Sequence, residues 1–179
     1  MIPDKRIEEI LLANGFTDYK WIDHDEIPVS HWVRMKCMYG CSEYGKNACC
    51  PPNVPSVQDC QELLGEFKRI LIFQFSLDPT SPSERTKWAK RVNKRLLELE
   101  RTLFLEGLVR AFVLIISSCN LCSECTGNKK DCKHPSEARP TPEAFAIDVY
   151  SAAQNVGFPI HVLKTRDETM NRYALVLVD

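Results

Sequence analysis

The segment Cys119-Asn-Leu-Cys122-Ser-Glu-Cys125, followed by Cys132, places four cysteines within 14 residues. Thiolates two residues apart can face one metal centre from a single tight loop. A third cysteine at the same spacing favours a cubic iron–sulfur cluster over a lone ion, because a cube presents several corners to one loop. Bacterial ferredoxins use the related spacing C-x2-C-x2-C-x3-C-P for [4Fe–4S] clusters. Here the last gap is six residues, so the spacing predicts an iron–sulfur site that is not of the ferredoxin type.

A structural zinc site is the main alternative. Zinc is also held by four cysteines, usually as two pairs that are well separated in sequence, and a triplet fits that arrangement poorly. Disulfides fit less well still, because nine cysteines are an odd number and a triplet this tight cannot pair locally without strain. The ligand pattern therefore favours iron–sulfur and leaves zinc open.

A second cysteine-rich stretch covers residues 37–52, and its glycines and prolines predict an irregular loop. So many cysteines in one loop indicate a second metal site, or ligands that complete the first. In the second case the sequence does not decide which cluster Cys132 binds. The usable spacing is C-x3-C-x8-C, formed by Cys37, Cys41 and Cys50, with Cys49 as an alternative third ligand. Cys50 is preferred because it precedes a proline, as a ligand cysteine does in ferredoxins. Cys49 should point the opposite way, because neighbouring side chains alternate along an extended segment, so both are not expected to reach one metal.

Composition is that of an ordinary globular protein. The chain has 179 residues, of which 44% are hydrophobic and 26% charged, and this predicts one domain over residues 1–179. The net charge of −1 gives no reason to expect nucleic acid or an anionic membrane as a partner. No apolar run approaches about 18 residues, so no membrane-spanning helix is expected. No export signal is apparent, and we expect a reducing cytoplasm, where dense cysteine favours metal over disulfides.

Apolar periodicity and capping residues predict four helices, over residues 4–14, 57–65, 82–105 and 142–156. The third is the longest, and a capping box from Ser81 to Glu84 should begin it. Cys60 falls on the apolar stripe of the second helix, so it is expected in the core rather than at a metal.

Strands are predicted where β-branched and aromatic residues gather: 69–75 and 109–117, with short ones near 21–22, 159–164 and 172–178. The first two flank the longest helix, which predicts a right-handed parallel crossover. The last two should form a hairpin. The expected fold is α/β or α+β: a single domain with a mixed sheet of about four or five strands, packed helices, and two cysteine-rich loops that fold against each other at one edge.

The two cysteine stretches together resemble a family of predicted metal-binding proteins of unknown function, common in anaerobic bacteria and archaea. Its pattern is C-x3-C-x2-Y-G-x4-C-P-P early and C-x2-C-x2-C-x6-C-x-H-P-x3-R-P-S-x-E-A-x-G-I-D-V late. The matching residues are Cys37, Cys41, Tyr44, Gly45, Cys50, Pro51, Pro52, Cys119, Cys122, Cys125, Cys132, His134, Pro135, Arg139, Pro140, Glu143, Ala144, Ile147, Asp148 and Val149. Thr141 and Ala146 depart from it mildly, and Cys49 lies outside it. The resemblance implies metal binding, with iron–sulfur as the expected form, and implies no reaction.

Three further residues of the late motif are expected to support the site without binding metal. Metal sites need hydrogen-bonded neighbours that hold and tune the ligands. Arg139 would donate to a cluster sulfide or pair with Glu143 or with Asp148, which is expected in the middle of a helix. An ordinary surface ion pair is the alternative.

Three function classes stay open, and no nucleotide-binding motif narrows them. The chain could be an electron-transfer protein with one or two clusters of the [4Fe–4S] type, an enzyme whose cluster keeps an open iron, or a non-catalytic module with structural zinc. The early stretch offers only three ligands that fit the pattern, which favours the enzyme slightly because catalytic metals keep an open position. The expected partner is a redox protein or a small-molecule substrate.

Overall fold

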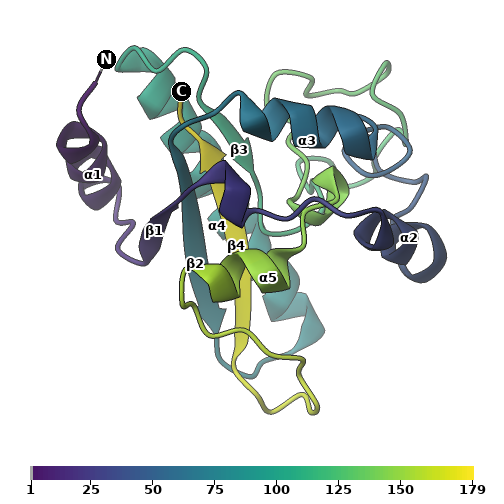
Figure 1. Cartoon of the computed structure of the whole chain (residues 1–179). Coiled ribbons are helices and arrows are strands. Elements are labelled where there is room, and N and C mark those ends of the chain that lie inside the picture. The colour runs from purple at the N-terminus through teal and green to yellow at the C-terminus, as the bar shows by residue number, and fades with distance from the viewer. Residues whose placement is uncertain (1) are drawn as a thin grey trace.

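The computed structural model describes residues 2–179 as a four-stranded sheet with helices on both faces (Figure 1). In chain order the elements are α1 (Asp4–Ala13), β1 (Tyr19–Ile22), the 3-10 helix η1 (His24–Glu26), α2 (His31–Gly40), α3 (Val57–Gly65), β2 (Ile70–Leu77), α4 (Pro82–Leu105), β3 (Phe112–Leu114), the 3-10 helix η2 (Glu143–Phe145), α5 (Val149–Asn155) and β4 (Met170–Leu177). The fold is therefore α+β. Among the described helices, none combines the length and the apolar character needed to cross a bilayer.

The sheet has the order β1-β2-β4-β3, and every neighbouring pair is antiparallel. Because β2 and β3 both run against β4, they are parallel to each other, as the strand–helix–strand pattern predicts. The expectation of a mixed sheet is wrong, because β4 returns from the end of the chain and inserts between them. Leu177 lies opposite Ile70 on one side and Phe112 on the other.

Two core layers result from the alternation of side chains along the strands. On one face, α1 and α4 pack against β2 and β4, with Leu99 and Val176 fully buried. On the other face, α3, η2 and α5 cover the sheet, with Leu175 and Cys60 fully buried. The expectation that Cys60 is a core residue is confirmed.

The helix predictions hold for α1, α3 and α4, and side-chain caps begin α3 and α4, whereas no side chain caps the start of α1. Both halves of a capping box form at Ser56 and Asp59. At α4 only half forms: the Ser81 hydroxyl accepts the N–H of Glu84, whose carboxylate turns to Lys87 instead.

The predicted helix over 142–156 is broken in two. Ala146 adopts the left-handed conformation, with φ of 59°. Its carbonyl accepts the N–H of Ser30, and the N–H of Asp148 donates to the carbonyl of Pro28. The segment before α2 therefore forms hydrogen bonds with backbone groups that would bond within a continuous helix. Asp148 is consequently the N-cap of α5 rather than a mid-helix residue.

Two other segments differ from the sequence prediction. Residues 31–40 form α2, where an irregular loop was expected from residue 37, because no glycine or proline interrupts residues 29–39. The predicted hairpin has only its second strand. The N–H groups of Lys164 and Thr165 donate to the carboxylate of Glu168, so a local turn satisfies them instead of a neighbouring strand.

Candidate metal centre

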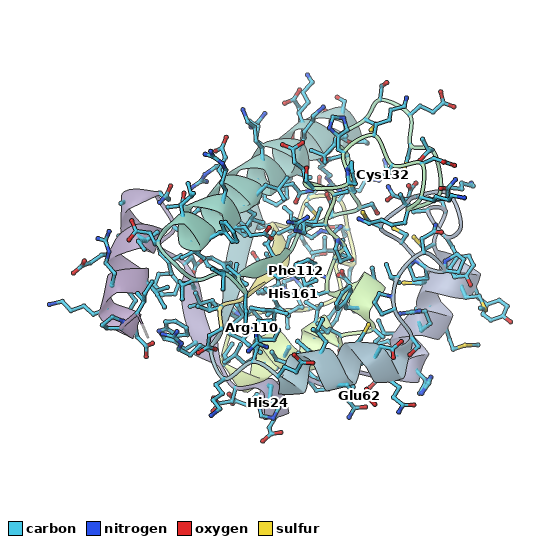
Figure 2. All side chains as sticks on the ribbon, turned by 90° about the horizontal axis from the view of Figure 1, so that it is seen from above. His24, Glu62, Arg110, Phe112, Cys132 and His161 are labelled. Carbon is cyan, nitrogen blue, oxygen red and sulfur yellow. The ribbon has the colours of Figure 1, made fainter. Side chains whose placement is uncertain are left out.

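The seven predicted ligands fall into two groups. The first, which we name the late thiol set, contains Cys119, Cys122, Cys125 and Cys132, and all four line one small cavity. The second, the early thiol set, contains Cys37, Cys41 and Cys50. Figure 2 shows Cys132 in the loop region at one end of the molecule, well apart from His24 and Glu62.

The late thiol set lies on a long segment without helix or strand that leaves the sheet after β3 and returns at η2. The N–H of Ile115 donates to the carbonyl of Pro140 at 2.9 Å, which closes the base of this segment. Two buried side chains of α4 hold β3 and the residues just after it, where this segment begins. Asn93 accepts the N–H of Ile116, and Glu100 accepts the N–H of Val113 at 2.7 Å. The long helix therefore fixes where the cysteines begin.

The early and late cysteine segments pack against each other, next to the N-terminal end of α3 in Figure 1. The amide nitrogen of Asn47 donates to the carbonyl of Cys119 at 2.9 Å, and that of Asn53 to the carbonyl of Gly127 at 2.8 Å. The backbone N–H of Ala48 donates to Cys125 Sγ at 3.3 Å. An N–H bond of this kind is one means by which a protein stabilises a metal-bound thiolate. The two segments thus form one composite region, as the sequence analysis expects.

Adjacent cysteines of the early segment reach different sets. The Cys49 side chain is buried, lines the cavity of the late thiol set and contacts the Cys119 thiol. Cys50 points the other way, with its sulfur 3.8 Å from the hydroxyl oxygen of Ser118 and near Cys41 and Cys37. Cys49, outside the sequence pattern, is therefore a fifth thiol beside the late set.

The thiols of the two sets differ in how their pKa values are shifted. The hydrogen bond from Cys49 lowers the pKa of Cys119 to about 6, against the opposing effect of burial, and backbone N–H groups add to it. The same contact, followed by burial, raises the pKa of Cys49. In the early set, burial raises the pKa of Cys50 to about 11 and also raises that of Cys37. Metal binding there must release protons.

Cys37 and Cys41 of the early thiol set line a cavity of about 590 Å³. Cys37 lies in the last turn of α2 and Cys41 follows the helix, four residues later, so both can face the same side. Cys37 Sγ is 3.9 Å from the carbonyl oxygen of Glu143. The opposite wall comes from β4 and the segment before it. Two thiols of the early set therefore stand beside an open space that can hold a small molecule, and the third, Cys50, lies near them.

Arg139 and Asp148 do not interact as the sequence analysis expects. The Arg139 guanidinium pairs with Glu100 of α4, with Nε 2.9 Å from Oε2. The ion-pair partners expected from sequence, as alternatives to a cluster sulfide, were Glu143 and Asp148, but Asp148 accepts hydrogen bonds from Ser151. Arg139 thus anchors the end of the late segment to the core. Glu100 was missed as a partner, although its spacing from Leu96 and Leu103 places it on the apolar face of the helix.

The arrangement of the thiols can be compared with what a cluster and what a single metal ion would require. Within residues 2–179, no three Cys, His, Asp or Glu side chains are grouped closely enough for one ion. A cubic cluster spreads its thiolates over several irons, so it does not need that convergence. The late cavity measures only about 20 Å³, the space of one water. It would have to widen around a cluster, which a segment without helix or strand permits.

The fold and site define a cysteine-rich α+β protein whose two thiol sets meet at one end of the sheet. A family described as a predicted metal-binding protein (DUF2284) matches residues 20–178, and the chain belongs to this family. The resemblance drawn from the sequence is thereby confirmed, and it carries no assigned reaction. No curated protein and no solved structure matches the chain.

Proposed function

We propose that the chain is an iron–sulfur enzyme in which the early thiol set leaves one iron position open toward the 590 Å³ cavity. The observation that carries this proposal is the number of thiols in the early set, two of which, Cys37 and Cys41, line that cavity. Cys37, Cys41 and Cys50 are three, whereas a fully ligated [4Fe–4S] cluster takes four. An iron with an open position can act as a Lewis acid or as a sulfur acceptor when a substrate enters.

The surroundings of Cys37 support an open fourth position. The nearest acidic side chain that acts on its thiol is Glu143, and the sulfur itself meets only the backbone carbonyl of that residue. A carboxylate is a poor substitute for thiolate at iron–sulfur clusters, which are held by cysteines. Lys36 and Ser42, which also line the cavity, are not cluster ligands of that kind.

The late thiol set has the complement that a closed cluster needs, and we assign it to electron supply. Two pairs of adjacent residues connect it to the early set. Cys49 and Cys50 contact one set each, and the sulfur of Cys50 meets Ser118, the neighbour of Cys119. Electrons arriving from a redox partner at the late set would have a short path to the early set. A reducing cytoplasm would keep the cysteines of both thiol sets reduced and able to bind metal.

Mössbauer spectroscopy of anaerobically prepared, iron-57-labelled protein tests the open position. Added imidazole should change the signal of a minority of the iron and leave the rest unchanged, because only one position at the early set can accept it. If no iron responded while sulfide and iron were both present, the early set would be fully ligated and the enzyme assignment would fail.

Structural zinc at the late thiol set is the second candidate: the cavity is small enough for one ion, although the thiols would have to converge further around it. A space of about 20 Å³ suits one ion better than a cube, and zinc is held tetrahedrally by four thiolates. In that case the late set would contain one zinc per chain and no sulfide.

A further inference from the structure

We infer that the 590 Å³ cavity binds a small organic monoanion, a carboxylate attached to an apolar body. The inference rests on the proposed function in treating this cavity as the substrate site. The binding itself depends on the walls of the cavity, so it can be tested separately from the metal.

The cavity has the size and the apolar walls of a small-molecule site. Such sites measure roughly 300–1,000 Å³ and are lined mainly by hydrophobic side chains with a few polar groups that orient the ligand. Here the aliphatic wall comes from several elements: Val33, Ile147, Ile160, Leu163 and Met170. Trp32 of α2 and Tyr150 of α5 add aromatic surface. An apolar ligand body would be well accommodated.

Most polar side chains of the lining already have partners within the chain. The carboxylate of Asp148, for example, accepts the hydroxyl of Ser151 at 2.6 Å. The other polar side chains have partners in the segment before β4, in the strand β2 or in the loop that follows β2. These satisfied residues are Asp148, His161, Thr169, Asn171 and Tyr173. They shape the cavity and leave few groups for a ligand.

Three charged side chains of the lining have no hydrogen bond or ion pair among residues 2–179. They are Lys36, Glu143 and Arg172. Glu143 lies on the thiol side, because its backbone carbonyl oxygen is 3.9 Å from Cys37 Sγ. Because Asp148 also lines the cavity and is hydrogen-bonded only by the neutral Ser151, the two cations and two carboxylates of the lining balance. A single negative charge on a ligand must therefore be matched locally, by the guanidinium of Arg172, which has no partner among residues 2–179.

The positions of these groups give the ligand an orientation. Arg172 belongs to β4, whereas the thiols come from α2. The planar guanidinium of arginine suits a carboxylate, which it can bind through two parallel hydrogen bonds. Thiolates and Glu143 at the other wall would repel the same carboxylate. The ligand would therefore place its carboxylate at Arg172 and its apolar body along the aliphatic wall, toward Cys37 and Cys41.

Arg172 and Lys36 are exposed, and the simpler alternative is that both are solvated surface charges. Equilibrium dialysis of the anaerobically purified protein against labelled benzoate, with benzamide as the neutral analogue of the same shape, separates the two. We expect saturable binding of benzoate and binding of benzamide that is weaker by about tenfold, the loss of one charged hydrogen-bond interaction. Arg172→Met should weaken benzoate binding by a similar factor.

Arg91→Met is the matched control, because Arg91 is an exposed arginine of α4 outside the cavity lining. It should leave benzoate binding unchanged. Equal binding of benzamide and benzoate, an unaffected Arg172→Met variant, or no saturable binding of benzoate would each overturn the inference. Iron and sulfide measured in the same samples report on the proposed function independently, so failure of one does not imply failure of the other.

Discussion

Arg139 and Glu100 form a largely buried ion pair, and the same Glu100 carboxylate accepts the backbone N–H of Val113. The pair therefore joins the end of the late cysteine segment, the long helix α4 and the edge strand β3. The Arg139 guanidinium also lies over the ring of Phe112, 5.1 Å from its centre. This ion pair thus holds the base of the segment that carries four cysteines, together with the hydrogen bond between Ile115 and Pro140.

Arg139→Ala should destabilise the protein by roughly 3 kcal/mol, because it leaves the Glu100 carboxylate buried without its cation. Thermal or denaturant unfolding measures this effect. Lys94→Ala is the control, since the pair of Lys94 with Glu98 is exposed and should contribute at most about 0.5 kcal/mol. Equal effects of the two substitutions would show that the Arg139 pair is an ordinary surface contact.

Asn47→Ala should loosen the contact between the two cysteine segments. The Asn47 side chain is only 3% exposed, accepts the N–H of Cys49 and donates to the carbonyl of Cys119. Its removal leaves both groups unsatisfied, at a cost of about 1–3 kcal/mol in unfolding free energy. Asn128→Ala, in an exposed turn of the late segment, should have a much smaller effect. We also expect Asn47→Ala to lose metal faster to a chelator.

Cys50→Ser should lower the metal content or change its spectrum, and Cys49→Ser should do so much less. The reason is that Cys50 completes the early thiol set, whereas Cys49 is a fifth thiol beside a set that already has four. Metal analysis and absorption spectra of the two variants, prepared side by side without oxygen, make the comparison. The reverse ranking would make Cys49 a ligand of the late set.

If both sets hold clusters, their reduced forms should interact magnetically. Cys49 and Cys50 are adjacent, and Cys50 also meets Ser118, the neighbour of Cys119, so the two centres can be separated by little more than these residues. Electron paramagnetic resonance of the fully reduced protein should show broadened or split signals that sharpen when only one centre is reduced. Two independent, unperturbed signals would contradict this spacing.

Local features of the fold were predictable from the sequence because they depend on nearby residues. The stripe on α4 and the cap at Ser56 are such cases. The insertion of β4 between β2 and β3 was not, since it depends on pairing between strands far apart in the chain. The break at Ala146 was missed for the same reason: the groups that compete with the helix belong to Pro28 and Ser30.

The site shows the same division between local and distant information. Spacing alone identifies which cysteines belong together along the chain, and the family match agrees with the metal-binding pattern. It does not show that Cys49 faces the late set while Cys50 faces the early one. Nor does it show the ion pair of Arg139, because its partner Glu100 lies 39 residues away on a helix whose charged residues mostly face solvent.

The most direct test of the iron–sulfur assignment is the iron, acid-labile sulfide and zinc content of anaerobically purified protein, measured together with its absorption spectrum. An iron–sulfur protein should be brown, with iron and sulfide in nearly equal amounts, as in [4Fe–4S] clusters, and little zinc. Stoichiometric zinc without sulfide, in colourless protein prepared without oxygen, would contradict the assignment.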